Sequence, residues 1–332
     1  MVPSTSTPTL IDAHGRVIDY LRVSVTDRCD LRCTYCLPKA FKGFETPANW
    51  LRHDEMARLV GLFVGMGVRH VRLTGGEPLT RGGLTGFVRR LSALPGLHDL
   101  SLSTNGTRLD RMAHALREAG VRRLNVSLDS LDADCMARIT GRDCLADVLR
   151  GLAVAREAGF DPIKLNMVVQ PGVNAHEVDG MVGFARDHGL VLRLIEPMPM
   201  GDTGRQAPAC DLTRLVESLA SRHGLLPQVL GRGAGPARYW RDPHSGMSLG
   251  VITPLSQHFC DTCNRVRLGV DGTLYLCLGQ DDQVPLGRLL RQGADDGQLR
   301  QAILAGLARK PAKHEFNVHR EKIVRFMSQT GG

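Results

Sequence analysis

The sequence has no long apolar run. No uninterrupted apolar stretch approaches the roughly 20 residues that a membrane-spanning helix needs, so we expect no transmembrane segment. The first ten residues are rich in serine, threonine and proline, and they lack the basic start and apolar core of a signal peptide. We therefore expect a flexible N-terminal arm over residues 1–11 and a cytoplasmic protein.

Aromatic residues are also scarce. They make up 5% of the 332 residues, which leaves few platforms on which nucleic-acid bases could stack. The formal net charge of +8 favours an anionic partner, but the basic residues are scattered and form no long run. We therefore expect neither a nucleic acid nor a membrane as partner, and favour a polyanionic small molecule. A zinc-containing nucleic-acid-binding module stays as a weaker alternative.

Segments of strand type and of helix type alternate along the first two thirds of the chain. Apolar alternation predicts strands over residues 20–26, 68–73, 100–103, 124–128, 163–169 and 191–195. Helical spacing predicts helices over residues 54–66, 84–94, 109–119, 144–158 and 175–188. This order is typical of an α/β protein with a parallel sheet, and the pattern alone leaves a doubly wound sheet and a barrel both open.

Two stretches rich in glycine, proline and polar residues, 201–209 and 231–236, are predicted to be loops. Short strands are expected beyond them, with a hairpin turn at Asp271 and Gly272 and a return strand over residues 274–278. Helices are expected again over residues 285–291 and 298–307. The change in pattern predicts a core of residues 12–231 and a C-terminal α+β region of residues 232–332.

Six of the nine cysteines fall into two close groups of three. Such grouping disfavours a disulfide framework in a chain of this size and fits a reducing compartment. The first group follows the first predicted strand with the spacing Cys-x3-Cys-x2-Cys: Cys29, Cys33 and Cys36. The second has one pair before the predicted hairpin and its third member on the return strand: Cys260, Cys263 and Cys277. We interpret Cys135, Cys144 and Cys210 as ordinary thiols.

Three neighbouring thiolates suit a four-iron cluster that leaves one iron open to a small molecule, because cluster irons are held by cysteine sulfur. A structural zinc ion instead wants four protein ligands. His258 could complete such a zinc site in the second group, and Cys260 and Cys263 could also form a disulfide. These alternatives stay open on spacing alone.

The first cysteine group, with Tyr35 before its last cysteine, resembles the signature of radical S-adenosylmethionine (SAM) enzymes. The resemblance implies a partial (β/α)6 TIM-like barrel and a [4Fe-4S] cluster whose open iron chelates SAM. An electron from the cluster then cleaves SAM to a 5′-deoxyadenosyl radical. The resemblance assigns SAM contacts to the following positions: Tyr35, Gly76, Glu77, Ser127 and Met198.

The whole chain from about residue 11 resembles the GTP 3′,8-cyclase family of molybdenum-cofactor biosynthesis. The matching segments occur in family order and include the second cysteine group and a terminal pair of glycines. They are residues 21–29, 72–79, 103–106, 125–131, 164–166, 196–200, 260–268 and 331–332. The resemblance implies that a second [4Fe-4S] cluster, in the C-terminal extension, binds the guanine of GTP.

The implied reaction has three parts. The 5′-deoxyadenosyl radical removes the 3′ hydrogen of GTP, the C3′ radical attacks C8 of the purine, and reduction with protonation yields (8S)-3′,8-cyclo-7,8-dihydroguanosine 5′-triphosphate. The resemblance also implies an external electron donor, a homodimer and transfer of the product to cyclic pyranopterin monophosphate synthase. A radical SAM enzyme that modifies a peptide is the main alternative.

Cations beside the predicted strands fit this substrate, because charged side chains next to buried strands need an anionic partner and arginine binds phosphate well. Arg265 and Arg267 alternate along one predicted strand and so share a face. Arg193 is a weaker candidate. The resemblance assigns GTP contacts to Arg22, Arg72, Ser103, Lys164, Arg265, Val266 and Arg267. It assigns catalytic roles to Arg265, Arg267, Gly331 and Gly332.

Overall fold

The computed structural model describes residues 9–208, 210–229, 235–316 and 325–331. Most of the predicted N-terminal arm, four residues of the predicted loop at 231–236, and Gly332 lie outside these ranges. Leu10, at the start of the described chain, is buried in the hydrophobic core. Ile11 forms an isolated antiparallel bridge with Val17.

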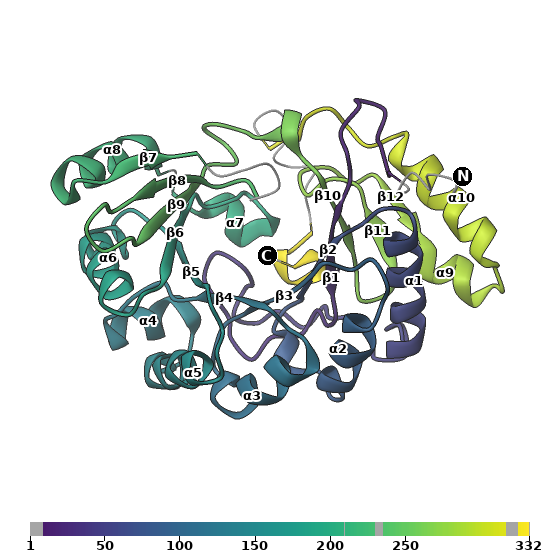
Figure 1. The fold of residues 1–332 in the computed structure, drawn as a ribbon, viewed down its shortest axis with the longest axis horizontal. Coiled ribbons are helices and arrows are strands. Elements are labelled where there is room, and N and C mark those ends of the chain that lie inside the picture. Colours follow the sequence, from purple (N-terminus) through teal and green to yellow (C-terminus); the bar gives the residue numbers. More distant parts are fainter. Residues whose placement is uncertain (1–8, 209, 230–234, 317–324, 332) are drawn as a thin grey trace, which may run out of the picture.

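Six neighbouring parallel strands form the centre of the sheet, which confirms the predicted parallel arrangement. They curve into an open arc that surrounds the C-terminus of the chain (Figure 1). The strands are β1 (Tyr20–Ser24), β2 (His70–Thr74), β3 (Asp99–Thr104), β4 (Arg123–Ser127), β5 (Ile163–Val168) and β6 (Val191–Ile195). The arc matches the partial barrel that the sequence implied.

Helices cover the outer, convex side of this arc (Figure 1). They are α1 (His53–Gly65), α2 (Leu84–Ser92), α3 (Leu109–Ala119), α4 (Ala133–Thr140), α5 (Leu145–Glu157) and α6 (Val178–Asp187). Three short 3-10 helices accompany them: η1 (Pro78–Thr80), η2 (Ala175–Glu177) and η3 (Cys260–Thr262). The sequence pattern missed α4, whose first turn is capped by the Asp132 carboxylate through a 2.7 Å bond from the Cys135 amide.

Residues from the C-terminal part extend both edges of the same sheet. At one edge β6 is followed by β9 (Ser248–Ile252), β8 (Arg238–Arg241) and β7 (Leu226–Gln228). At the other edge β1 is followed by β10 (Arg265–Leu268), β11 (Thr273–Tyr275) and β12 (Gln283–Pro285). Because β9 and β10 run parallel to β6 and β1, the arc is longer than the six predicted strands.

Two expectations for the C-terminal half were wrong. Residues 201–209 are not simply a loop, because α7 (Gly201–Gln206) occupies most of them, with Asp202 in its first turn and Arg205 in its last, as the helix dipole favours. Cys277 does not lie on the return strand, because β11 ends at Tyr275.

The remaining helices of the described chain are α8 (Leu212–His223), α9 (Leu286–Arg291), α10 (Asp296–Leu307) and α11 (Met327–Thr330).

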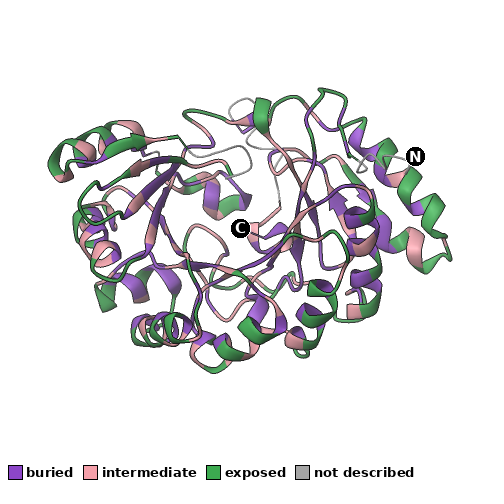
Figure 2. Ribbon diagram, viewed as in Figure 1, coloured by how far each residue is buried: buried purple, intermediate pink, exposed green. Residues whose placement is uncertain are grey.

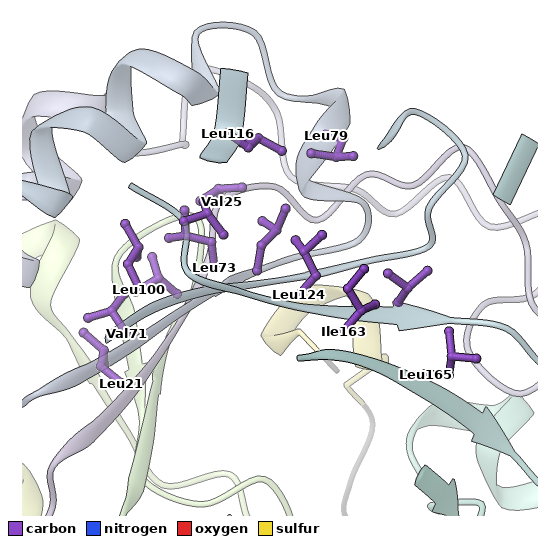
Figure 3. Close-up of a cluster of buried hydrophobic side chains, with 14 of the residues drawn as sticks. Leu21, Val25, Val71, Leu73, Leu79, Leu100, Leu116, Leu124, Ile163 and Leu165 are labelled. Atoms are coloured by element: carbon purple, nitrogen blue, oxygen red, sulfur yellow. The ribbon is translucent and has the colours of Figure 1, made fainter. Parts of the chain in front are cut away.

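The core lies between the central strands and the outer helices. Leu21, Val71, Leu73, Leu100 and Leu124 gather in one buried cluster with apolar side chains from the helices and loops (Figure 3). The strands are buried, whereas the solvent side of the helices is exposed (Figure 2). Alternation along β1 and β2 therefore directs the residues between these leucines and valines to the inner face of the arc. No helix in the described ranges is long and apolar enough to cross a membrane.

Candidate active site

Cations lie side by side on the inner face of the sheet. Strand register pairs Arg22 of β1 with Arg72 of β2 on one side and with Arg267 of β10 on the other. Burial, followed by the charges of Arg267 and Arg72, lowers the pKa of Arg22 well below its usual value. Three adjacent guanidinium groups, two half-buried and that of Arg267 buried, repel one another, so this row needs an anion to neutralise it.

These arginines line a cavity enclosed by the arc. The other cations in its lining are Arg123, Lys164, Arg193, Arg265 and Lys310. No aspartate or glutamate occurs among the lining residues that the structure describes. The Nε atoms of Arg22 and Arg72 are buried and have no hydrogen-bond partner within the described chain. Buried unsatisfied donors of this kind are rare, and they indicate a site for a ligand rich in acceptor oxygens.

Lys164 lies further along the same cavity, on β5. Burial, together with the charges of Arg193, Arg123 and Arg72, lowers its pKa to about 7. Arg193, which was the weaker candidate, is buried, and its guanidinium donates to the side-chain oxygens of Asn166 and Asn125. These neutral partners leave its charge available, whereas Arg123 is already paired with Asp99.

The second cysteine group opens into this cavity. Cys260, Cys263 and Cys277 all line it, beside Arg265 and Lys310. Each sulfur has a backbone donor: the amide of Arg265 bonds to Cys263, that of Gly279 to Cys277 and that of His314 to Cys260. Six of the seven predicted GTP contacts therefore line the same cavity as the second cysteine group. Ser103 is the exception, since it lies on β3 but outside the cavity lining.

The first cysteine group lies in the loop after β1. Burial raises the pKa of the Cys29 thiol to about 12 and that of Cys36 to about 11, and the three cysteines interact electrostatically. All of them are free thiols. A buried thiolate is stable only beside positive charge, and iron would supply that charge to each of the three sulfurs. The donor set therefore fits an iron–sulfur cluster.

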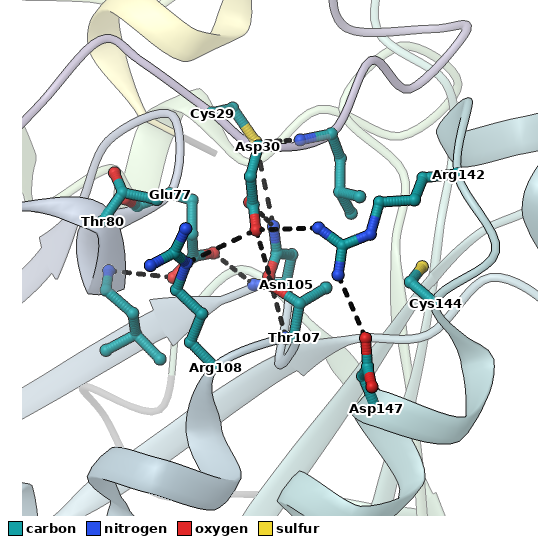
Figure 4. Close-up of polar contacts among 12 residues, drawn as sticks. Cys29, Asp30, Glu77, Thr80, Asn105, Thr107, Arg108, Arg142, Cys144 and Asp147 are labelled. Carbon is teal, nitrogen blue, oxygen red and sulfur yellow. Dashed lines mark hydrogen bonds and ion pairs between the residues drawn. The ribbon is translucent and has the colours of Figure 1, made fainter.

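Asp30 anchors this loop to the turn after β3 (Figure 4). Its carboxylate accepts hydrogen bonds from Asn105 Nδ2 at 2.8 Å and from Thr107 Oγ1 at 2.9 Å. The same Asn105 Nδ2 lies 3.8 Å from the Cys29 sulfur. Arg108 and Arg142 approach Asp30 from the solvent side, at 3.6 and 3.5 Å. The position of Cys29 is thus fixed by side chains of a different strand–helix turn.

The turn Gly75-Gly76-Glu77 packs against the start of the cysteine loop. A Cβ atom on Gly75 would lie 2.3 Å from the Thr26 carbonyl oxygen, and one on Gly76 would lie 2.2 Å from that of Arg28, so only glycine fits at both positions. Glu77 is fully buried and accepts bonds from Leu79 N, Thr104 Oγ1 and Asn105 N. Burial raises its pKa to about 7.

The other predicted SAM contacts lie in the cysteine loop, at the end of β4 and after β6. The Tyr35 hydroxyl donates to Asp129 Oδ2 at 2.7 Å, and Asp129 also accepts from the Val168 amide at 2.8 Å. Burial raises the pKa of Asp129 to about 6. Ser127 is half-buried at the end of β4, and Met198 follows β6 and lines the cation-rich cavity.

The C-terminal segment with α11 lies inside the arc (Figure 1). The Ser328 amide bonds to the Cys36 sulfur, and the Arg267 guanidinium donates to the carbonyl oxygens of Thr330 and Gly331. Gly331 has φ +74°, and a Cβ atom there would lie 2.2 Å from Thr74 Cγ2. The described end of the chain therefore contacts both the first cysteine loop and the cation row.

The sequence analysis missed Arg123, Lys310 and the aromatic residues that flank the cations. The Lys164 ammonium lies over the Tyr239 ring at 6.0 Å, and the Arg265 guanidinium lies over the Phe259 ring at 5.3 Å. In the sequence, no signal distinguishes Arg123 or Lys310 from a surface cation. Within the described ranges, no group of three or more histidine, cysteine or acidic residues could hold a single metal ion.

Comparisons with known proteins match nearly the whole chain. A model of the radical SAM superfamily matches residues 23–185, and one described as Molybdenum Cofactor Synthesis C matches residues 190–316. A GTP 3′,8-cyclase of Ectopseudomonas mendocina is 45% identical over 97% of this chain and 98% of its own length. GTP 3′,8-cyclase 1 of Pseudomonas aeruginosa is 47% identical over 97% of this chain and 99% of its own.

Solved structures agree on the fold. The crystal structure of Streptococcus suis SuiB bound to the precursor peptide SuiA has a TM-score of 0.65 and 13% identity, and the match covers 93% of this chain and 68% of that one. At this identity the likeness concerns the fold alone: a mixed α/β partial barrel with a C-terminal extension. The curated relatives decide the family, and the chain belongs to the GTP 3′,8-cyclase family of the radical SAM superfamily.

Proposed function

We propose that this chain converts GTP into (8S)-3′,8-cyclo-7,8-dihydroguanosine 5′-triphosphate, an early step of molybdenum-cofactor biosynthesis. The observation that carries the proposal is the cavity in which unneutralised cations meet a three-cysteine group. A nucleoside triphosphate has a polyanionic end and a base with nitrogen donors, so one molecule matches both halves of this cavity. The family of the chain supports the same substrate.

In this proposal Cys29, Cys33 and Cys36 hold the first [4Fe-4S] cluster. With SAM bound, that cluster supplies the 5′-deoxyadenosyl radical, which takes the 3′ hydrogen of GTP. The chain's own residues hold SAM: the backbone of Gly76 permits close approach, Glu77 faces the methionyl ammonium group, and Ser127 and Met198 contact the cofactor from the end of β4 and from the segment after β6. Tyr35 keeps the cysteine loop in place through its hydrogen bond to Asp129.

The triphosphate binds to the cations of the inner face. Arg22, Arg72 and Lys164 neutralise its charge, and Arg265 and Arg267 approach from β10. Bidentate contacts from arginine suit phosphate oxygens, and the unpartnered Nε atoms of Arg22 and Arg72 support this role. Val266 lies between the two β10 arginines and Ser103 offers a hydroxyl from β3. Both belong to the proposed GTP contacts.

The guanine is held at the other end of the cavity by a second [4Fe-4S] cluster on Cys260, Cys263 and Cys277. Binding at both ends fixes the ribose between them, with C3′ accessible to the adenosyl radical and C8 close enough for cyclisation. Arg267 and Gly331, whose carbonyl oxygen accepts from the guanidinium, close the space between the two cysteine groups. Their role is to keep the C3′ radical away from water and other hydrogen donors.

We further propose a division of labour along the chain. Residues 12–231 bind SAM, residues 232–332 bind the second cluster and guanine, and residues 1–11 take no part in either task. An external donor supplies the electrons, the chain acts as a homodimer, and the product passes to cyclic pyranopterin monophosphate synthase. Family resemblance supports these partners.

Deuterium transfer tests the proposed function. GTP that carries deuterium at C3′ is incubated anaerobically with the iron-loaded chain, SAM and dithionite, and 5′-deoxyadenosine is analysed by mass spectrometry. We expect one deuterium in the deoxyadenosine, and none when the label is at C8 instead. Unlabelled deoxyadenosine from the C3′-labelled substrate would show that hydrogen is taken elsewhere and would contradict the proposal.

A further inference from the structure

Lys310 is a buried cation that no step proposed so far uses. It follows α10, is 2% exposed and lines the cavity beside the second cysteine group. Its ammonium group donates to the carbonyl oxygen of Leu276, the residue before Cys277. Within the described residues it forms no ion pair with a carboxylate. A buried ammonium group without such a partner is unfavourable unless a negative charge lies nearby.

Lys310 lines the same cavity as the three cysteines of the second group, and its hydrogen bond to the Leu276 carbonyl oxygen places its charge beside Cys277. Arg265 adds a second positive charge beside Cys263. Arg16 also reaches this region, where it donates to the Cys260 carbonyl oxygen at 2.9 Å, but its charge is offset by Asp12 at 2.6 Å.

The first cysteine group has the opposite surroundings. The Cys29 sulfur lies 4.0 Å from the Asp30 carboxylate, and the buried Glu77 carboxylate is a second negative neighbour. Asp129 is the corresponding neighbour of Cys33. Arg108 and Arg142 pair with Asp30 from outside, where solvent screens them, since both are more than two-fifths exposed. Carboxylates thus lie beside Cys29 and Cys33, with the Arg32 cation beside Cys36, whereas the buried Lys310 adjoins the second group.

A cluster held by three thiolates carries a net negative charge, and its one-electron reduction makes that charge larger without forming or breaking a bond. A buried positive charge stabilises the reduced state, and buried carboxylates destabilise it. We propose that Lys310 is a positioning residue that acts through the second cluster and holds its reduction potential above that of the first. This inference rests on the proposed function, because it requires a cluster at the second group.

Potentiometric EPR titration of the reconstituted full-length chain tests this inference. Signals are assigned to each cluster with the Cys33→Ser and Cys263→Ser variants. In the unchanged chain we expect the second cluster to be reduced at the higher potential. In Lys310→Met its midpoint should fall while that of the first cluster stays unchanged, and Lys310→Arg should restore the higher value.

Lys313→Met is the matched control, because it removes an exposed lysine three residues away. It should leave both midpoints unchanged, since water screens that charge. The role of Lys310 would be overturned if the midpoint potential of the second cluster did not move in Lys310→Met. It would also be overturned if the second cluster of the unchanged chain were not the more easily reduced of the two. This comparison of the two clusters tests the proposal even if Lys310→Met does not fold. An iron content of one cluster would overturn the proposed second cluster as well.

Discussion

Arg267 of β10 holds Gly331 inside the barrel by donating a hydrogen bond to its carbonyl oxygen. The same guanidinium nitrogen donates to Thr330 at 3.2 Å, and Arg267 lies in register beside Arg22. One side chain therefore links the end of the chain to the cation row. This link explains how residues 326–331, which carry no charged side chain, can be kept within a polar cavity.

Gly331→Ala should displace this terminal segment. The new Cβ atom would meet Thr74, and the positive φ at this position adds about 1 kcal/mol of backbone strain. We expect the variant to keep its iron content but to form at least 10-fold less cyclised product, as measured by mass spectrometry, an order-of-magnitude estimate.

Gly189→Ala is the control for backbone strain alone. Gly189 has φ +63°, but no atom lies within 4 Å of an added Cβ. It should lower the melting temperature slightly and leave product formation unchanged. Equal product loss in both glycine variants, or none in Gly331→Ala, would contradict a role for the terminal segment in the site.

Lys164→Ala should weaken GTP binding while both clusters remain. Loss of one charge-assisted contact to phosphate corresponds to about 1.5–3 kcal/mol, which is a roughly 10- to 100-fold weaker affinity. Isothermal titration calorimetry under anaerobic conditions measures it, with iron content as the check on assembly. An affinity equal to that of the unchanged chain would remove Lys164 from the proposed contacts.

The lowered pKa of Lys164 predicts a pH dependence. In the free site the pKa of Lys164 is about 7, and a bound triphosphate raises it. The contribution of the lysine to GTP binding is therefore complete below pH 7 and is lost as the pH rises through the pKa of Lys164 in the complex. Phosphate ionises near pH 6 and guanine N1 only in more alkaline solution, so between roughly pH 7.5 and 8.5 the change reports the lysine. GTP affinity should fall over this range.

Lys164→Arg should bind GTP with little pH dependence over the same range, because guanidinium stays protonated. A parallel decline in both proteins would assign the titration to another group.

Glu77→Gln should destabilise the turn that packs against the cysteine loop. The buried carboxylate accepts bonds from two amides and a hydroxyl, and the amide nitrogen of glutamine cannot replace an acceptor oxygen. An unsatisfied buried donor costs about 1–3 kcal/mol, so the melting temperature and SAM affinity should both fall. Glu157→Gln, at an exposed glutamate, should change neither. Unaltered SAM binding in Glu77→Gln would exclude the proposed ammonium contact.

Cys33→Ser should abolish the formation of 5′-deoxyadenosine, because the first cluster loses a ligand. The second cysteine group lies elsewhere in the barrel and should keep its cluster. Liquid chromatography of the SAM products measures the effect, and EPR checks the remaining cluster. Normal SAM cleavage in this variant would contradict the assignment of the first group.

The central strands could be predicted because their buried sides alternate regularly. Leu21 and Val23 pack on the core side, and alternation places Arg22 on the other side of the strand. What the pattern could not supply is register across distant segments. The pairing of Arg22 with Arg267 joins strands far apart in the chain and depends on packing of the whole arc.

The same limit explains the residues that were missed. Arg123 and Lys310 resemble surface cations in sequence, and only their position against the cavity distinguishes them. The segment 201–209 was wrongly predicted to be a loop because it contains glycines. Gly204 is nevertheless required in α7, because a Cβ atom at this position would lie only 2.5 Å from the Met198 carbonyl oxygen. Tertiary contact here outweighs the low helix propensity of glycine.

The most direct test of the central claim is anaerobic analysis of the small molecules. The iron-loaded chain is mixed with SAM, GTP and dithionite, the products are separated, and their masses are determined by mass spectrometry. We expect 5′-deoxyadenosine together with an isomer of GTP that has the same mass as GTP. Deoxyadenosine formed while GTP stays intact, in a chain that carries both clusters, would contradict it.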